Sequence, residues 1–151
     1  VPVGNGSLLI GIMKAYEELI NQKKIKSMPR IHCIQVERFS PIVNKFNNLD
    51  WEFDRSSKTL AGGIAVTNPP RINQVIEAIQ LSNGNAIEVS ENQVLSWHKK
   101  LAEWGFLSEI TCAAALAGTE ILIKKGIINK KSNLVVPITG SGLKDIDNVN
   151  F

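Results

Sequence analysis

Two glycine-containing turns carry amide and hydroxyl groups that could bind a small anionic ligand. The first, Gly4-Asn5-Gly6-Ser7, follows a short apolar stretch and precedes a helical pattern. Backbone amides at a helix N-terminus are unpaired and lie at the positive end of the helix dipole, so a phosphate group can bind there. Glycines let the backbone approach phosphate oxygens, and Ser7 adds a hydroxyl donor. The alternative is an ordinary Asn-Gly tight turn, because the sequence has neither the P-loop lysine motif nor the three-glycine dinucleotide motif.

The second turn, Thr139-Gly140-Ser141-Gly142, follows an apolar stretch that is typical of a strand. In open parallel α/β sheets, ligands bind beyond the carboxyl ends of the strands. Both turns are therefore expected at the same edge of the sheet, where the Thr139 hydroxyl could exchange a hydrogen bond with a ring nitrogen. Taken alone, this motif is better explained as a simple glycine turn that leaves a strand.

Hydrophobic spacing predicts short strands that alternate with helices. Apolar residues three and four positions apart indicate a helix over 8–22, with Ser7 as its N-cap. Ser40 is the expected N-cap of a short second helix, and Ser90 with Gln93 has the spacing of a capping box. Further helices are expected over 41–47, 69–83, 91–104 and 112–125, irregular structure over 48–68, and strands over 31–36, 86–89 and 134–138. This order predicts one domain with a parallel α/β sheet and right-handed crossovers.

The composition is that of an ordinary globular protein, and it argues against several classes. The 151 residues are 44% hydrophobic and 21% charged, with a net charge of +3. The basic residues are spread along the chain without interleaved aromatic residues, so nucleic-acid binding is not expected. The apolar stretches are too short to cross a membrane, and neither histidine has further ligands at metal-binding spacing. Cys33 and Cys112 are expected to be buried free thiols, which favours a reducing compartment such as the cytoplasm.

Five stretches occur in an order that resembles the C-terminal half of threonine synthase, a fold type II pyridoxal-phosphate enzyme. They are PVGNGSLLIG, MPRIHCIQVE, TLAGGIAVTNPPR, SEITCAAALAG and VVPITGSGLKD. The resemblance runs from Pro2 to about Asp145, and its most specific parts are AAALAG and TGSGLKD. It implies a three-layer α/β sandwich with a mostly parallel sheet, of the tryptophan synthase beta-like type. It also implies that residues 1–151 are a single domain, the C-terminal large-domain portion of a longer enzyme.

The resemblance further implies which residues hold pyridoxal 5'-phosphate. The family's phosphate loop is matched by Gly4, Asn5, Gly6, Ser7 and Leu8, although the last two depart from the Gly-Asn-Ala-Gly-Asn form of many relatives. Thr139 matches the residue that contacts the pyridine nitrogen. The segment 62–65 matches a glycine-containing loop near the cofactor, and Glu109 is expected to bond a helix N-terminus rather than take part in chemistry.

The Schiff-base lysine of the family lies in its N-terminal half, outside the present sequence. None of the lysines here is in a Ser-x-Lys-Asp context, and Lys144 matches the family's terminal motif. The resemblance therefore implies that this chain has no catalytic residue and no metal site, and that it is inactive by itself.

For the intact enzyme, the resemblance implies conversion of O-phospho-L-homoserine and water to L-threonine and phosphate by a cytoplasmic homodimer. Three alternatives remain open. The first is another fold type II lyase, such as a serine or threonine dehydratase or a cysteine synthase. The second is a non-catalytic remnant that acts as a binding module. The third is a nucleotide-binding α/β module, which the missing nucleotide motifs disfavour.

Overall fold

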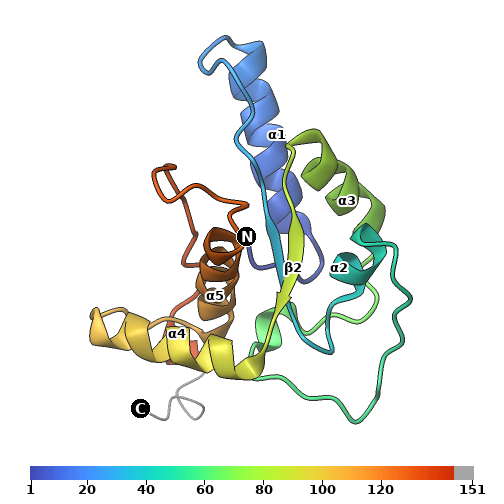
Figure 1. Ribbon diagram of the computed structural model, residues 1–151, viewed down its shortest axis with the longest axis vertical. Helices are drawn as coiled ribbons and strands as arrows, with labels where there is room; N and C mark the ends of the chain where they lie inside the picture. The colour runs from blue at the N-terminus through green and yellow to red at the C-terminus, as the bar shows by residue number, and fades with distance from the viewer. Residues whose placement is uncertain (145–151) are drawn as a thin grey trace.

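The computed structural model describes residues 1–144, which form helices on both faces of a short parallel sheet (Figure 1). In chain order, the elements are α1 (Ser7–Asn21), β1 (Cys33–Val36), α2 (Pro41–Phe46), the 3-10 helix η1 (Gly62–Ile64), α3 (Ile72–Leu81), β2 (Ala86–Val89), α4 (Glu91–Glu103) and α5 (Ile110–Lys124). The predicted helices and the first two predicted strands are confirmed, with boundaries that differ by a few residues. Asp145 of the TGSGLKD motif lies outside the described residues.

The sheet is parallel, as the alternation of elements predicts. β1 and β2 pair in register from Cys33 opposite Ala86 to Val36 opposite Val89. The residues before α1 extend the sheet on its other side, because Pro2 forms a parallel bridge with Ile34. Parallel neighbours need a long crossover connection, and α2 and α3 lie in the crossover between β1 and β2.

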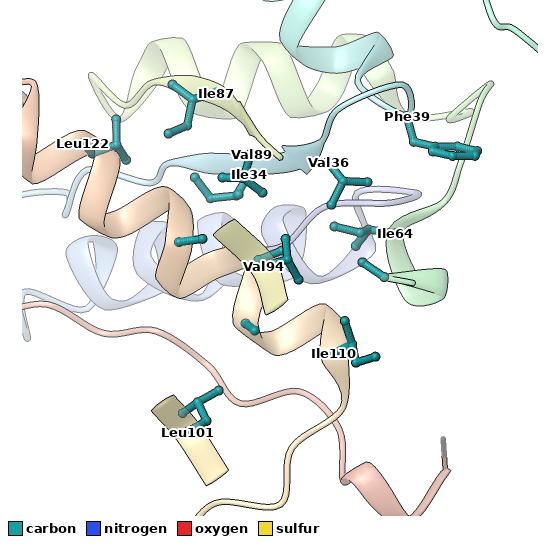
Figure 2. Close-up of a cluster of buried hydrophobic side chains, with 14 of the residues drawn as sticks. Ile34, Val36, Phe39, Ile64, Ile87, Val89, Val94, Leu101, Ile110 and Leu122 are labelled. Carbon is teal, nitrogen blue, oxygen red and sulfur yellow. The ribbon is translucent and has the colours of Figure 1, made fainter. Parts of the chain in front are cut away.

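Different helices cover the two faces of the sheet, which gives three layers. Side chains alternate along a strand, so Ile34 and Val36 face α4 and α5 (Figure 2). Cys33 packs on the opposite face, with α1 and α3. The helices α1, α2 and α3 form one hydrophobic cluster with their face of the sheet, and α4 and α5 form another. In Figure 1, α2 and α3 lie to one side of the strands, and α4 and α5 lie to the other.

Small side chains allow α5 to lie close to β1. Residues 110–115 and 117–118 of α5 are buried, and most of them are alanine, cysteine, threonine or glycine. At Gly118, an added Cβ would overlap the side chain of Ile34 on β1. The small-residue stretch therefore makes room for a branched side chain of the central strand.

The helix caps agree only in part with the sequence predictions. The capping box of Ser90 and Gln93 is confirmed. Ser40 occupies the N-cap position of α2, but its side chain makes no capping bond. Ser7 is the first residue of α1 rather than its N-cap, because Gly6 takes the N-cap position with a left-handed backbone that glycine adopts most readily.

The prediction of a strand over 134–138 is wrong. The structure assigns no regular secondary structure to these residues, and no strand among the described residues pairs with them. Val135 is 85% exposed, so the stretch has the apolar composition of a buried strand without the neighbour that would bury it. A strand is defined by hydrogen bonds to a partner, which local composition does not supply.

Both cysteines are free and buried, as predicted. Burial raises the pKa of the Cys33 thiol to about 12. A neutral thiol is a poor nucleophile, so Cys33 is a packing residue of the face that α1 and α3 cover.

His32, next to β1, should make the protein less stable in mild acid. Burial, with Arg30 nearby, lowers its pKa from 6.5 to about 4. Between these two values the unfolded chain binds a proton that the folded chain does not, so stability is lost as the pH falls from about 6.5 to about 4. The imidazole is partly exposed, and solvent screening reduces the effect. Urea unfolding at several pH values in this range should show that the free energy of unfolding falls less steeply with pH in His32→Asn than in the unmodified protein. An equal fall in the two proteins would contradict this role of His32.

Candidate functional site

A pocket of about 350 Å³ lies where the first turn, η1, the start of α5 and the second turn meet. All six residues proposed from the sequence line it: Gly4, Asn5, Gly6, Ser7, Leu8 and Thr139. The structure thus brings together two turns that are more than 130 residues apart in the sequence. Pro2, Leu9, Gly63, Ile64, Glu109 and Thr111 complete the wall.

One end of the pocket is the N-terminus of α1. Gly6 is the N-cap with a φ of 90°, and no side chain caps the helix. The first backbone bond of the helix runs from the Ile10 amide to the Gly6 carbonyl at 3.0 Å. The amides of Ser7, Leu8 and Leu9 therefore lack helical partners, and they carry the positive end of the helix dipole. This end of the pocket is chemically suited to a phosphate group.

Close packing holds the first turn against the loop that contains η1. A Cβ on Gly4 would lie 3.1 Å from the Gly63 carbonyl oxygen and 3.2 Å from the Ile64 Cα, which is tighter than ordinary contact. A Cβ on Gly6 would overlap Val75 of α3. Both glycines are therefore required by the packing of the turn, which explains why this motif has a glycine on each side of Asn5.

Arg71 places a positive charge beside this end of the pocket. Its Nη1 donates a hydrogen bond to the Ser7 hydroxyl at 3.4 Å. Arg71 is not recognisable as a site residue from the sequence alone, because it lies 64 positions from Ser7. Its position at the end of the TNPPR stretch could have indicated that it belongs to the site. A guanidinium near uncapped amides adds to the attraction for an anion.

The second turn brings Thr139 to the same pocket. Its hydroxyl lies 3.5 Å from the Cys112 Sγ, and Cys112 also donates to the Gly140 carbonyl at 3.6 Å. The Glu109 amide donates to the same carbonyl at 3.0 Å. Thr139 is therefore positioned by contacts with the start of α5, whereas the sequence analysis expected a strand to position it.

The start of α5 contributes Glu109 and Thr111 to the wall of the pocket. Glu109 occupies the N-cap position of α5, but its side chain makes no capping bond, so the prediction that it bonds a helix N-terminus is wrong. Its carboxylate lies against Gly63 and Gly140 instead. Thr111, which the sequence analysis did not single out, accepts a hydrogen bond from the Gly63 amide at 3.2 Å. The start of α5 thus contacts both glycine loops.

Residues 1–144 contain no group of three or more His, Cys, Asp or Glu side chains placed to hold a metal ion. No helix in the same part of the chain has the length and apolar character needed to span a bilayer.

The chain resembles known proteins over nearly its whole length. It is 31% identical over 150 residues to the threonine synthase of Methanocaldococcus jannaschii, an alignment that covers 97% of this chain and 37% of that protein. The threonine synthase of Halalkalibacterium halodurans is 30% identical over 146 residues, which covers 96% of this chain and 39% of that protein. The chain therefore spans about two fifths of the length of these curated relatives.

The fold is shared with a crystal structure of a threonine deaminase from T.th. The TM-score is 0.62 at 19% sequence identity, and the match covers 100% of this chain and 49% of the other. This similarity confirms the predicted α/β fold, in which a parallel sheet lies between two helical layers. Residues 1–140 match the model of the pyridoxal-phosphate dependent enzyme family, and the chain belongs to that family.

The pocket fits the phosphate end of the family's cofactor. The uncapped amides of α1 supply donors, and Gly4 and Gly6 form a turn whose packing leaves no room for side chains at these two positions. When bound, pyridoxal phosphate supplies an electron sink for reactions at amino-acid carbons.

Proposed function

We propose that this chain forms the pyridoxal-phosphate site of a threonine synthase. The observation that carries the proposal is the pocket that the α1 N-terminus and Thr139 share. Asn5 and the first-turn amides of α1 hold the phosphate, and Arg71 assists through Ser7. The Thr139 hydroxyl meets the ring nitrogen at the other end. Similarity to several threonine synthases at 29–31% identity supports this assignment.

The activity that we propose for the whole enzyme is conversion of O-phospho-L-homoserine and water to L-threonine and phosphate. In this proposal, residues 1–151 are the C-terminal portion of the enzyme, and the N-terminal portion supplies the lysine that carries the cofactor. The chain by itself is inactive. We further propose that the enzyme is a homodimer in the cytoplasm, in keeping with the free cysteines at positions 33 and 112.

The first test is the coding sequence upstream of Val1, which should encode a Ser-x-Lys-Asp motif. The second is phosphate release from O-phospho-L-homoserine by the protein that contains this lysine. Release of ammonia from serine or threonine without use of phosphohomoserine would identify a dehydratase instead. An upstream sequence without the lysine would leave the non-catalytic binding module as the function.

The substitution Thr139→Val should reduce turnover by the intact enzyme about tenfold or more, because it removes the hydroxyl that faces the ring nitrogen and preserves the side-chain shape. The free energy of unfolding should change by less than about 1 kcal/mol, since Thr139 is exposed and outside regular structure. The matched control is Thr119→Val on α5, whose hydroxyl donates to the Ala115 carbonyl away from the pocket. Unchanged turnover for Thr139→Val would contradict the proposed ring contact.

A further inference from the structure

Glu109 fills a space that two glycines leave open. A Cβ on Gly63 would lie 2.8 Å from the Glu109 Oε1, and a Cβ on Gly140 would overlap the Oε2 of the same carboxylate. One oxygen therefore lies against each loop, in the place that an ordinary side chain would occupy. The carboxylate explains Gly140, and together with the Thr111 hydroxyl, whose Oγ1 would lie 2.9 Å from a Cβ on Gly63, it explains Gly63. Neither glycine has the positive φ that would itself demand glycine.

Backbone and hydroxyl contacts from the same helix turn hold both loops to this carboxylate. The Glu109 amide donates to the Gly140 carbonyl at 3.0 Å, and the Gly63 amide donates to the Thr111 hydroxyl at 3.2 Å. The Gly63 loop in turn packs on Gly4 of the first turn. A continuous set of contacts thus links the phosphate end of the pocket, through Gly63 and Glu109, to the loop that carries Thr139.

The carboxylate has no other evident structural task. Among the described residues that line the pocket, Glu109 is the one with an ionisable side chain. It forms no ion pair within residues 1–144, and it does not cap α5. Its carboxylate oxygens lie between the two glycines and fill the space that separates the two loops there.

We propose that Glu109 is a positioning residue that sets the gap between the Gly63 loop and the Gly140 loop, and with it the distance from the α1 N-terminus to Thr139. The importance of that distance for cofactor binding rests on the function proposed above. A ligand that spans the pocket, such as pyridoxal phosphate, needs the gap to be correct. Inorganic phosphate, which occupies the α1 end alone, does not.

The test compares the affinities of these two probes in matched variants. Glu109→Ala should weaken binding of pyridoxal phosphate about tenfold and binding of inorganic phosphate less than about twofold. Glu109→Gln keeps the length and planar shape, and it should restore pyridoxal-phosphate affinity to within about threefold of the unmodified protein. Glu103→Ala, near the end of α4, is the control for loss of a carboxylate elsewhere. Equal weakening of both probes, no weakening, or failure of Glu109→Gln to restore affinity would each overturn the proposal.

A double-mutant cycle tests the spacing role of Glu109 independently of the proposed function. Gly140→Ala forces the carboxylate to move, so it should lower the free energy of unfolding in the unmodified protein and much less in the Glu109→Ala background. Additive effects would overturn the positioning proposal even where pyridoxal phosphate binds well. If the unmodified protein binds neither probe, the proposed function fails, and a non-additive cycle still supports the role of Glu109 in spacing the loops.

Discussion

Replacing Gly6 with alanine should remove most phosphate affinity and destabilise the fold at the same time. Gly6 has a φ of 90°, a left-handed conformation that costs about 1–2 kcal/mol for residues with a Cβ. The new Cβ would also overlap the Val75 side chain in the buried face of α3. Overpacking of this kind costs about 1–3 kcal/mol. The free energy of unfolding should therefore fall by about 2–5 kcal/mol.

The loss of binding follows from the same geometry. Because Val75 is fully buried, the turn should relieve the overlap by moving the N-cap of α1, and the amides of Ser7 and Leu8 move with it. Affinity for inorganic phosphate and for pyridoxal phosphate should drop at least about tenfold, since both probes need these donors. Titration calorimetry with each probe, at a temperature where the variant is folded, measures this effect.

Gly126→Ala is the matched control for Gly6→Ala. Gly126 follows α5 with a φ of 71°, and nothing lies within 4 Å of the position that an added Cβ would take. The substitution should destabilise the fold only by placing a Cβ in left-handed backbone, without overpacking. The affinities for inorganic phosphate and for pyridoxal phosphate should stay unchanged. A Gly6→Ala variant that binds phosphate as well as the Gly126→Ala variant would show that the α1 N-terminus is not the anion site.

Local sequence patterns predicted those parts of the fold that depend on near neighbours. The apolar positions of α1 repeat every three or four residues, and Ser90 and Gln93 satisfy each other within one turn of α4. Short apolar runs also identified β1 and β2, because both strands are buried inside the sheet. The two turns were identified by their glycine and hydroxyl composition, and the structure places both on one pocket.

The features that the sequence did not reveal depend on contacts between distant segments. The stretch 134–138 has a strand-like composition, but its pairing depends on a neighbour rather than on its own residues. Two contacts of the site join segments that are at least 31 positions apart. They are the hydrogen bond from Arg71 to Ser7 and the packing of Glu109 between Gly63 and Gly140. Residue spacing along one element contains no information about such contacts, and the site is built largely from them.

Gln35 shows how one buried polar side chain connects the core to the site. It is fully buried on β1, and its Nε2 donates to the Val3 carbonyl at 3.1 Å. Its Oε1 accepts hydrogen bonds from the amides of Ile42 at 2.9 Å and Val43 at 3.2 Å, and so it caps α2 where Ser40 does not. Val3 directly precedes the first turn, so the same side chain ties both α2 and the base of the pocket to the central strand.

Gln35→Leu should be the most destabilising of the substitutions considered for this protein. It leaves one carbonyl and two amides without their partner in the core, and each unsatisfied buried group costs about 1–3 kcal/mol. The free energy of unfolding should fall by about 3 kcal/mol or more. This is a large part of the total for a folded domain, which is typically about 5–15 kcal/mol. Urea unfolding, monitored by circular dichroism, measures this change. The urea concentration at the midpoint of the transition should fall, while the dependence of the free energy on urea concentration stays the same.

Two further variants separate lost hydrogen bonds from other effects of this substitution. Gln80→Leu, on the exposed side of α3, makes the same chemical change with no buried partner, and it should shift stability by less than about 0.5 kcal/mol. Gln35→Glu can still accept from both α2 amides, but its ionised form cannot donate to the Val3 carbonyl and brings a charge into the core. It should remain strongly destabilised near neutral pH and recover in part as acid protonates the carboxylate, because the protonated group regains a donor. A Gln35→Leu protein that unfolds within about 1 kcal/mol of the unmodified chain would mean that these backbone groups find other partners, and that the first turn does not depend on Gln35 for its position.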